Sequence, residues 1–449
     1  MKKIFSILGV ICIPFLFLLN TSHSYATEFR FGPDNDGELV VVLDPGHGGE
    51  NLGAEYEGRV EKEINMIVAN AMYERLSKYE GITVYMTRTE DVDLSLLERA
   101  EFAQSVNADF LFCLHFNMSE FHTLYGAEIW IQSEGIENQE GYRFGQVWIE
   151  DMQNHGLYLR GIKTRLNSKG TDYYGILRHC KEFGITAALL EHCHLDHLAD
   201  SGFANSEEDL KQFGILDADS LAKYFGLSSE ELGVNYCDYP LQEIEPNKQY
   251  MKVDTTAPDM CYAQVDKCDY ETGEVQISVM SYDIDTPMLY YQYSLDGGNN
   301  FSPLISWPSV DMLKEFSTDS FTFTVTIEQE TSPKIIVRVH NKYNITTDSN
   351  LLGDFHVFPT RTTTVLSPEM DVKQKDSSDN VSQKQDLIIQ EKEQDFASLL
   401  LKDHSSFWGF IMLVLIFVVL LFLSLLSIRL FFPNKMRRER KQAKENKNR

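Results

Sequence analysis

The pattern of apolar and polar residues divides the chain into a part that alternates strands with helices and a part that holds strands alone. In the first part, short apolar runs alternate with segments whose apolar residues recur at helical spacing. The runs that predict strands are 39–43, 83–86, 110–116, 127–131, 185–190 and a short one near 176–177. The segments that predict helices are 61–78, 94–105, 145–167 and 207–224. This order predicts an α/β domain over residues 38–228, with a parallel or mixed sheet covered by helices.

The helical spacing disappears in the second part. Residues 229–256 read as an acidic linker. Alternating or apolar runs then follow at 275–282, 288–293, 321–327 and 335–339, with turn residues at 295–299. These runs predict a β-sandwich over residues 257–358, similar to small immunoglobulin-like domains. Its many tyrosines leave open whether it is a spacer or a binding module.

The two ends of the chain carry targeting patterns. Residues 1–26 run from lysines through an apolar stretch to small residues, the order of a secretory signal peptide, although an uncleaved N-terminal anchor remains open. Residues 359–406 are polar and predict a flexible, disordered stalk. Residues 407–428 are apolar over the roughly 20 positions that a membrane-spanning helix needs. The basic tail, 429–449, marks the cytoplasmic side. We therefore expect a single-pass protein in the cell membrane, with its folded domains outside the cytoplasm.

Charge narrows the range of partners. The 449 residues carry a formal net charge of -27. Because the basic tail is positively charged, the negative charge lies in the rest of the chain, and the exported part is strongly acidic. An acidic surface repels phosphate backbones, which excludes nucleic acid as a partner. Of the seven cysteines, Cys261 and Cys268 are the best local candidates for a disulfide.

Four residues whose side chains could act in catalysis or bind a metal follow predicted strands or begin a predicted helix. His47 lies in a Gly-rich loop after the first strand, Glu61 begins the first helix, His115 ends the strand 110–116, and Glu191 follows the strand 185–190. Taken singly, each has a structural explanation, such as an acidic residue in the first turn of a helix. Glu191 is the hardest to explain in this way, because a carboxylate beside a buried strand needs a partner or a shifted pKa.

Taken together, two histidines and one carboxylate form the ligand set that is typical of catalytic zinc. Such zinc leaves a coordination position for water and lowers the pKa of that water to about 7. A further carboxylate, Glu191, can then take the proton from the water and pass it to a leaving amine. This pattern predicts a zinc hydrolase.

Residues 40–226 resemble the zinc-dependent N-acetylmuramoyl-L-alanine amidases of the amidase-3 type. The resemblance is carried by an ordered series of motifs: Asp44–Gly49, Glu61–Asn65, Met86-Thr87-Arg88 with Arg99 downstream, Leu114–Asn117, Gly126–Ile129 and Leu189-Leu190-Glu191. It implies a mixed sheet of about six strands between helices. It also implies Zn²⁺ ligands at His47, Glu61 and His115, a catalytic glutamate at Glu191, and substrate contacts by Asn117 and Arg99.

The substrate that the resemblance implies is peptidoglycan, cut at the amide between N-acetylmuramic acid and L-alanine. Two rival functions stay open: a surface protein that binds peptidoglycan without cutting it, and a zinc peptidase that acts on other substrates. Where the family commonly has a Gly-Phe-type loop, this chain has residues 192–197, which contain three histidines. That loop is expected either to line the cleft or to hold a second metal. The acidic segment 134–167 is expected to be an ordinary covering helix, since a regulatory helix is known only in some relatives.

Overall fold

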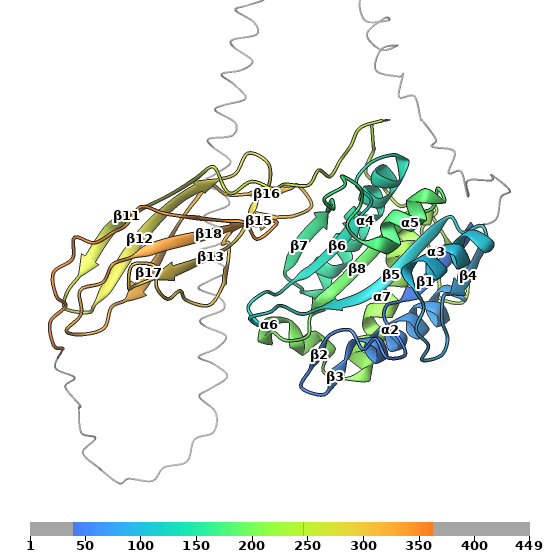
Figure 1. Ribbon diagram of the computed structural model, residues 1–449, viewed down its shortest axis with the longest axis horizontal. Helices are drawn as coiled ribbons and strands as arrows, with labels where there is room; N and C mark the ends of the chain where they lie inside the picture. The colour runs from blue at the N-terminus through green and yellow to red at the C-terminus, as the bar shows by residue number, and fades with distance from the viewer. Residues whose placement is uncertain (1–38, 246, 362–449) are drawn as a thin grey trace, which may run out of the picture. The chain divides into compact units, whose positions relative to one another are not determined.

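The computed structural model describes residues 39–245 and 247–361, which lie within one compact unit (Figure 1). The predicted signal peptide, the membrane span, the basic tail and nearly all of the stalk lie outside these residues. Within the described part of the chain, no helix combines the length and the apolar composition needed to cross a membrane. The targeting segments therefore stay predictions.

A six-stranded mixed sheet forms the centre of the first domain, in the order β4-β1-β5-β8-β6-β7. Its strands are β1 (Leu39–Pro45), β4 (Ile82–Met86), β5 (Phe110–Asn117), β6 (Ala127–Ile131), β7 (Leu159–Lys163) and β8 (Thr186–His194). Strands β4, β1, β5 and β8 are parallel to one another, whereas β6 runs antiparallel to β8 and parallel to β7. The mixed α/β sheet expected from the sequence is confirmed.

Helices cover both faces of this sheet, because alternate strand residues on each face are apolar. One face packs against α2 (Glu61–Leu76), α4 (Ile136–His155) and α7 (Glu207–Phe225), and the other against α3 (Leu96–Ser105) and α5 (Gly175–Glu182). On β5, for example, Phe112 belongs to the first cluster and Cys113 to the second. The segment 134–167 thus contains a covering helix, as expected.

Two stretches differ from the sequence-based expectation. Residues 159–163 were expected to be helical but form β7, because α4 ends early at Gly156, whose φ of 102° places it in the left-handed region. The short strand expected near 176–177 is wrong. Ile176 and Leu177 lie instead on the buried side of α5, together with Cys180 one turn later.

The segment predicted as a linker lies against the first domain. It contains a short hairpin of β9 (Ser228–Ser229) and β10 (Val234–Asn235). Further along, Tyr250 stacks on Tyr142 of α4 with ring centroids 4.6 Å apart, and Met251 is buried. The exact domain boundaries stay predictions.

Residues 257–361, here called the β-domain, contain two antiparallel sheets around a core of their own. The first sheet has the order β11-β12-β17 and the second β14-β13-β18-β19. Their strands are β11 (Met260–Asp269), β12 (Glu274–Tyr282), β13 (Met288–Ser294), β14 (Ile305–Ser306), β17 (Ser320–Thr326), β18 (Ile336–Asn341) and β19 (Thr346–Asp348). A β-rich second domain is therefore confirmed, while its likeness to immunoglobulin domains stays a prediction.

The expected disulfide between Cys261 and Cys268 is wrong. Both residues lie on the single extended strand β11, whose ends cannot meet without breaking its pairing with β12. All six cysteines of the described residues are free.

The closest packing between helices gives a test of the first domain. A Cβ added to Gly214 of α7 would lie 2.3 Å from the carbonyl oxygen of Val68 and 2.7 Å from the backbone nitrogen of Met72 on α2. We expect Gly214→Ala to lower the free energy of unfolding by about 2 kcal/mol, because backbone atoms of two packed helices must move apart. Urea denaturation of the two proteins measures the difference.

The matched control is Gly202→Ala, because a Cβ at Gly202 meets no atom within 4 Å. Its backbone has φ -60°, which alanine adopts freely, so its stability should stay within about 1 kcal/mol of the original protein. Equal stabilities of the two variants would contradict the close packing of α2 on α7.

Candidate metal and catalytic site

His47 is positioned by a loop at the carboxyl end of β1. Two buried arginines hold this loop through its backbone. Arg88 donates from Nε to the Pro45 carbonyl at 2.9 Å and from Nη2 to the Gly46 carbonyl at 3.0 Å. Arg99 donates to the carbonyl oxygen of His47 at 2.8 Å. These hydrogen bonds hold the loop in a defined shape, and this fixes the position of the His47 side chain.

Arg99 is itself held by an ion pair with Asp44 of β1, at 2.7 Å between Nη1 and Oδ1. Both side chains are almost completely buried. Removing either partner would leave the other charge buried and unpaired, which typically costs about 3–5 kcal/mol. The pair thus ties the loop to the sheet.

Glu61, the first residue of α2, points its carboxylate at both candidate histidines. Oε2 lies 3.0 Å from Nε2 of His47, and Oε1 lies 2.8 Å from Nδ1 of His115. The backbone nitrogens of Ala54 and Phe116 donate to the same carboxylate at 2.7 Å and 3.1 Å. Burial acts to raise the pKa of Glu61, but the two histidines outweigh it and hold the pKa well below its usual range. Glu61 is therefore ionised at neutral pH.

His115 lies near the end of β5, and His192 on β8 supports it from behind. Nδ1 of His192 is 2.9 Å from the backbone carbonyl oxygen of His115, and its Nε2 is 2.8 Å from Oδ2 of Asp217 on α7. With both ring nitrogens engaged and no exposed surface, His192 has no free atom to offer a metal. Its position supports the backbone of His115.

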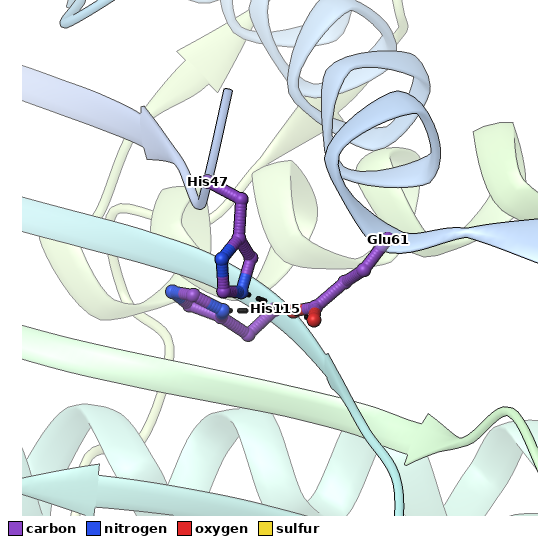
Figure 2. A group of neighbouring side chains, drawn as sticks. All are labelled: His47, Glu61 and His115. Atoms are coloured by element: carbon purple, nitrogen blue, oxygen red, sulfur yellow. Dashed lines mark hydrogen bonds and ion pairs between the residues drawn. The ribbon is translucent and has the colours of Figure 1, made fainter. Parts of the chain in front are cut away.

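These three side chains come from separate elements and meet in one place (Figure 2). The rings of His47 and His115 lie edge to face, with centroids 4.8 Å apart. One donor atom from each of His47, Glu61 and His115 lies within 4.8 Å of the others, which makes this the one group of metal-binding character among the described residues. Two imidazoles and an anionic carboxylate in this arrangement fit a Zn²⁺ ion.

Two glycines make room for the cluster. A Cβ at Gly46 would lie 2.2 Å from the His115 ring, and a Cβ at Gly53 would lie 2.4 Å from Oε2 of Glu61 and 2.6 Å from the His47 ring. No other residue type fits at either position without moving a member of the cluster.

Glu191 lies on β8 opposite His115 in the sheet register. It is partly buried, and its Oε2 has no hydrogen-bond partner. Burial raises the pKa of Glu191 well above its usual range, and the Glu61 and Glu128 carboxylates act in the same direction. A cation held by the neighbouring cluster would oppose this shift, since it favours the ionised carboxylate.

All four residues line one open pocket of about 430 Å³. Asn117 also lines it, whereas Arg99 does not. The remaining wall is largely apolar and includes Leu96, Met118 and Leu189. A pocket with a few converging polar groups and a mostly apolar wall is typical of a small-molecule or polymer-end site.

The predicted residues thus fall into two groups. His47, Glu61, His115, Glu191 and Asn117 converge on the pocket. Arg99 is buried behind it, where its guanidinium binds Asp44 and backbone carbonyls, so its placement does not fit the substrate contact expected from the resemblance. The second metal site expected as an option in 192–197 finds no support among the described residues.

Sequence reasoning missed the residues that hold the site from behind. Arg88 was noticed only as part of a motif, and His192 only as a member of a histidine-rich loop. Both bind backbone carbonyl oxygens. A sequence pattern does not predict such a contact, because every residue type has a backbone carbonyl.

Comparison with known proteins adds a family. Residues 41–223 match the family model described as N-acetylmuramoyl-L-alanine amidase. The chain is 29% identical to the N-acetylmuramoyl-L-alanine amidase CwlM of Bacillus licheniformis over 193 residues, 42% of this chain and 70% of CwlM. It is 30% identical to the probable amidase AmiB of Haemophilus influenzae over 137 residues, 30% of this chain and 31% of AmiB. The match to AmiB therefore spans about a third of that relative.

Two solved structures are also similar. Cwp6 from Clostridium difficile is 29% identical with a TM-score of 0.38, and the match covers 42% of this chain and 29% of Cwp6. The catalytic domain of the amidase CwlV from Bacillus (Paenibacillus) polymyxa is 23% identical with a TM-score of 0.37, and the match covers 41% of this chain and 97% of CwlV. The family match over residues 41–223 agrees with the resemblance expected from the motifs: this part of the chain is similar to N-acetylmuramoyl-L-alanine amidase domains.

Proposed function

We propose that this protein is a zinc-dependent hydrolase that cleaves the amide between N-acetylmuramic acid and L-alanine in peptidoglycan. The observation that carries the proposal is the convergence of two imidazoles, one ionised carboxylate and a second, unpartnered carboxylate on one pocket in an amidase-family domain. The activity serves cell-wall remodelling or turnover.

Zinc would be held by His47, Glu61 and His115. When bound, it supplies a Lewis acid that polarises the scissile carbonyl and makes a water molecule acidic enough to attack near neutral pH. The residues around it keep the ligands in place: Oδ1 of Asn51 accepts a hydrogen bond from Nδ1 of His47 at 2.9 Å, which leaves Nε2 directed at the cluster.

Glu191 moves the proton. Glu191 lines the pocket beside the candidate metal ligands, so its carboxylate can accept a proton from the attacking water and deliver it to the amide nitrogen. This delivery is required, because an amine leaves poorly unless it is protonated.

The proposal has two rivals. A protein that only binds peptidoglycan has no need for Glu191 beside a complete metal set, so its free carboxylate favours an enzyme. A zinc peptidase would use the same groups on another amide. Stem-peptide release from purified wall fragments, compared with cleavage of unrelated peptides, separates the two enzymes.

The substrate also sets a location. Peptidoglycan lies outside the cytoplasmic membrane, and residues 1–26 and 407–428 carry the patterns of a signal peptide and a spanning helix. We therefore include in the proposal an extracytoplasmic domain that is anchored by the C-terminal segment.

Metal binding is tested by His115→Ala. The variant should purify with less than about a tenth of the zinc of the original protein, because one of three protein ligands is lost. Elemental analysis after dialysis measures the content. His122→Ala is the control: His122 pairs with Asp196 at 2.8 Å, outside the cluster, and should leave the zinc content unchanged. Equal zinc in both variants would exclude His115 as a ligand.

Proton transfer is tested by Glu191→Gln, which preserves the shape of the side chain. We expect kcat for stem-peptide release to fall at least about 100-fold while the zinc content stays the same. Glu63→Gln, at an exposed position on α2, is the control and should retain full activity. A Glu191→Gln variant that cleaves at the original rate would remove Glu191 from the mechanism.

A further inference from the structure

The β-domain is packed against the edge strand β7 of the amidase sheet. Leu289 and Tyr290 of β13, with Met312, belong to the same buried cluster as the core of the first domain. The hydroxyl of Tyr158, which precedes β7, donates to the carbonyl oxygen of Leu289. The ring of Tyr290 packs edge to face on Tyr125, with centroids 5.1 Å apart. An interface with a shared apolar core is not what a freely moving spacer would show.

This interface contains two buried cations on β7. Arg160 and Lys163 are 2% and 1% exposed, and each donates to Oε2 of Glu128 on β6 at 2.7 Å. Burial acts to raise the pKa of Glu128, but the two cations outweigh it and hold the pKa well below its usual range. Burial and the Arg160 charge lower the pKa of Lys163 to about 7, although Glu128 opposes this. Arg160 therefore keeps its positive charge beside Glu128 more readily than Lys163 does.

The β-domain supplies the remaining partner of Arg160. Nη1 of Arg160 lies 3.2 Å from the hydroxyl oxygen of Tyr290, and that hydroxyl in turn donates to the backbone carbonyl of Tyr125. Its proton is thus committed to Tyr125, which leaves a lone pair directed at the guanidinium. Tyr343, also from the β-domain, places its ring 5.8 Å from Nζ of Lys163. Both cations are enclosed from one side by the first domain and from the other by the second.

The Glu128 carboxylate also contacts a residue that lines the pocket. Its Oε1 accepts from Nδ2 of Asn117 at 3.0 Å, and Asn117 lines the pocket. In the sheet, Glu128 of β6 is the direct register partner of Glu191 on β8, so both side chains leave the same face side by side. Any movement of the Glu128 carboxylate therefore acts on Asn117 through a hydrogen bond and on Glu191 through space.

We propose that the β-domain is a positioning element of the catalytic site: Tyr290 orients Arg160, Arg160 with Lys163 fixes Glu128, and Glu128 holds Asn117 and the neighbouring Glu191 in their working arrangement. This inference rests on the proposed function for its kinetic consequence, but the connection itself is structural. Tyr290, Arg160, Lys163 and Glu128 are positioning residues, since none of them touches the metal cluster. The β-domain is then needed for catalytic turnover and is more than a spacer or a binding module.

The test compares Tyr290→Phe with Tyr158→Phe in the whole protein. Both changes remove one tyrosine hydroxyl that bonds across the same interface, but only that of Tyr290 contacts Arg160. Tyr290→Phe should lower kcat for stem-peptide release on the order of tenfold, because a misplaced catalytic group costs rate steeply. KM should stay within about twofold for both variants, and Tyr158→Phe should keep kcat within about twofold, with equal zinc in all three proteins.

A second readout does not depend on activity. Amide hydrogen exchange of the metal-free proteins should be faster over residues 126–131 in Tyr290→Phe than in the original protein, and unchanged there in Tyr158→Phe. Glu128→Gln, which leaves both cations without an anion, should have a larger effect in the same region. It carries a risk of misfolding, so the tyrosine pair remains the deciding comparison.

The outcomes separate this inference from the proposed function. If the original protein releases no stem peptide, the proposed function fails, and hydrogen exchange still decides whether Tyr290 reaches β6. If the original protein is active but the two tyrosine variants match each other in kcat and in exchange, the β-domain does not position the site and the inference is overturned.

Discussion

The site depends on one buried carboxylate that is shared by two histidines. Glu61 starts a helix, His47 follows one strand and His115 ends another, so three separate elements must agree before their atoms meet. The carboxylate keeps its charge in a buried position only because imidazoles and backbone amides surround it. The same charge that stabilises the cluster makes it suitable for the divalent cation that we propose it binds. Other features of the domain serve this arrangement: two arginines shape the His47 loop, and two glycines leave space for the rings.

Much of this site was predictable because strand ends carry a local signal. His47, His115 and Glu191 each follow a run of apolar residues, and parallel strands bring their carboxyl ends to one edge. The sequence therefore predicted which side chains converge, and the family resemblance added the expectation of a Zn²⁺ ion there. The pattern of apolar residues also predicted five of the six sheet strands. The strand that it missed, β7, carries Arg160 and Lys163 in five residues, a composition that resembles a polar helix more than a buried strand.

What the sequence did not predict depends on partners that are distant along the chain. The family resemblance implied a substrate contact for Arg99, yet its guanidinium binds Asp44 and three backbone carbonyls. His192 belongs to the segment 192–197, which was expected either to line the cleft or to hold a second metal, yet Asp217 and a backbone carbonyl occupy both of its ring nitrogens. In both cases the side chain is of a type that can contact a ligand or a metal, but in the folded protein it binds other protein groups and supports the site. Local patterns do not contain that information, since it depends on which atoms the fold brings together.

The reversed direction of β6 connects the second domain to the pocket. In the parallel part of the sheet, residues near the start of a strand lie far from the catalytic edge. Because β6 runs antiparallel to β8, its second residue, Glu128, lies opposite Glu191 near the end of β8. The parallel pairing of β6 with β7 then places Arg160 and Lys163 within reach of that carboxylate, at the edge that the β-domain covers. A buried carboxylate there needs cations as partners. Strand β7 lies at the edge of the sheet, where unpaired backbone groups would be open to pairing with another chain unless another element covers them. In this chain the β-domain packs against that edge.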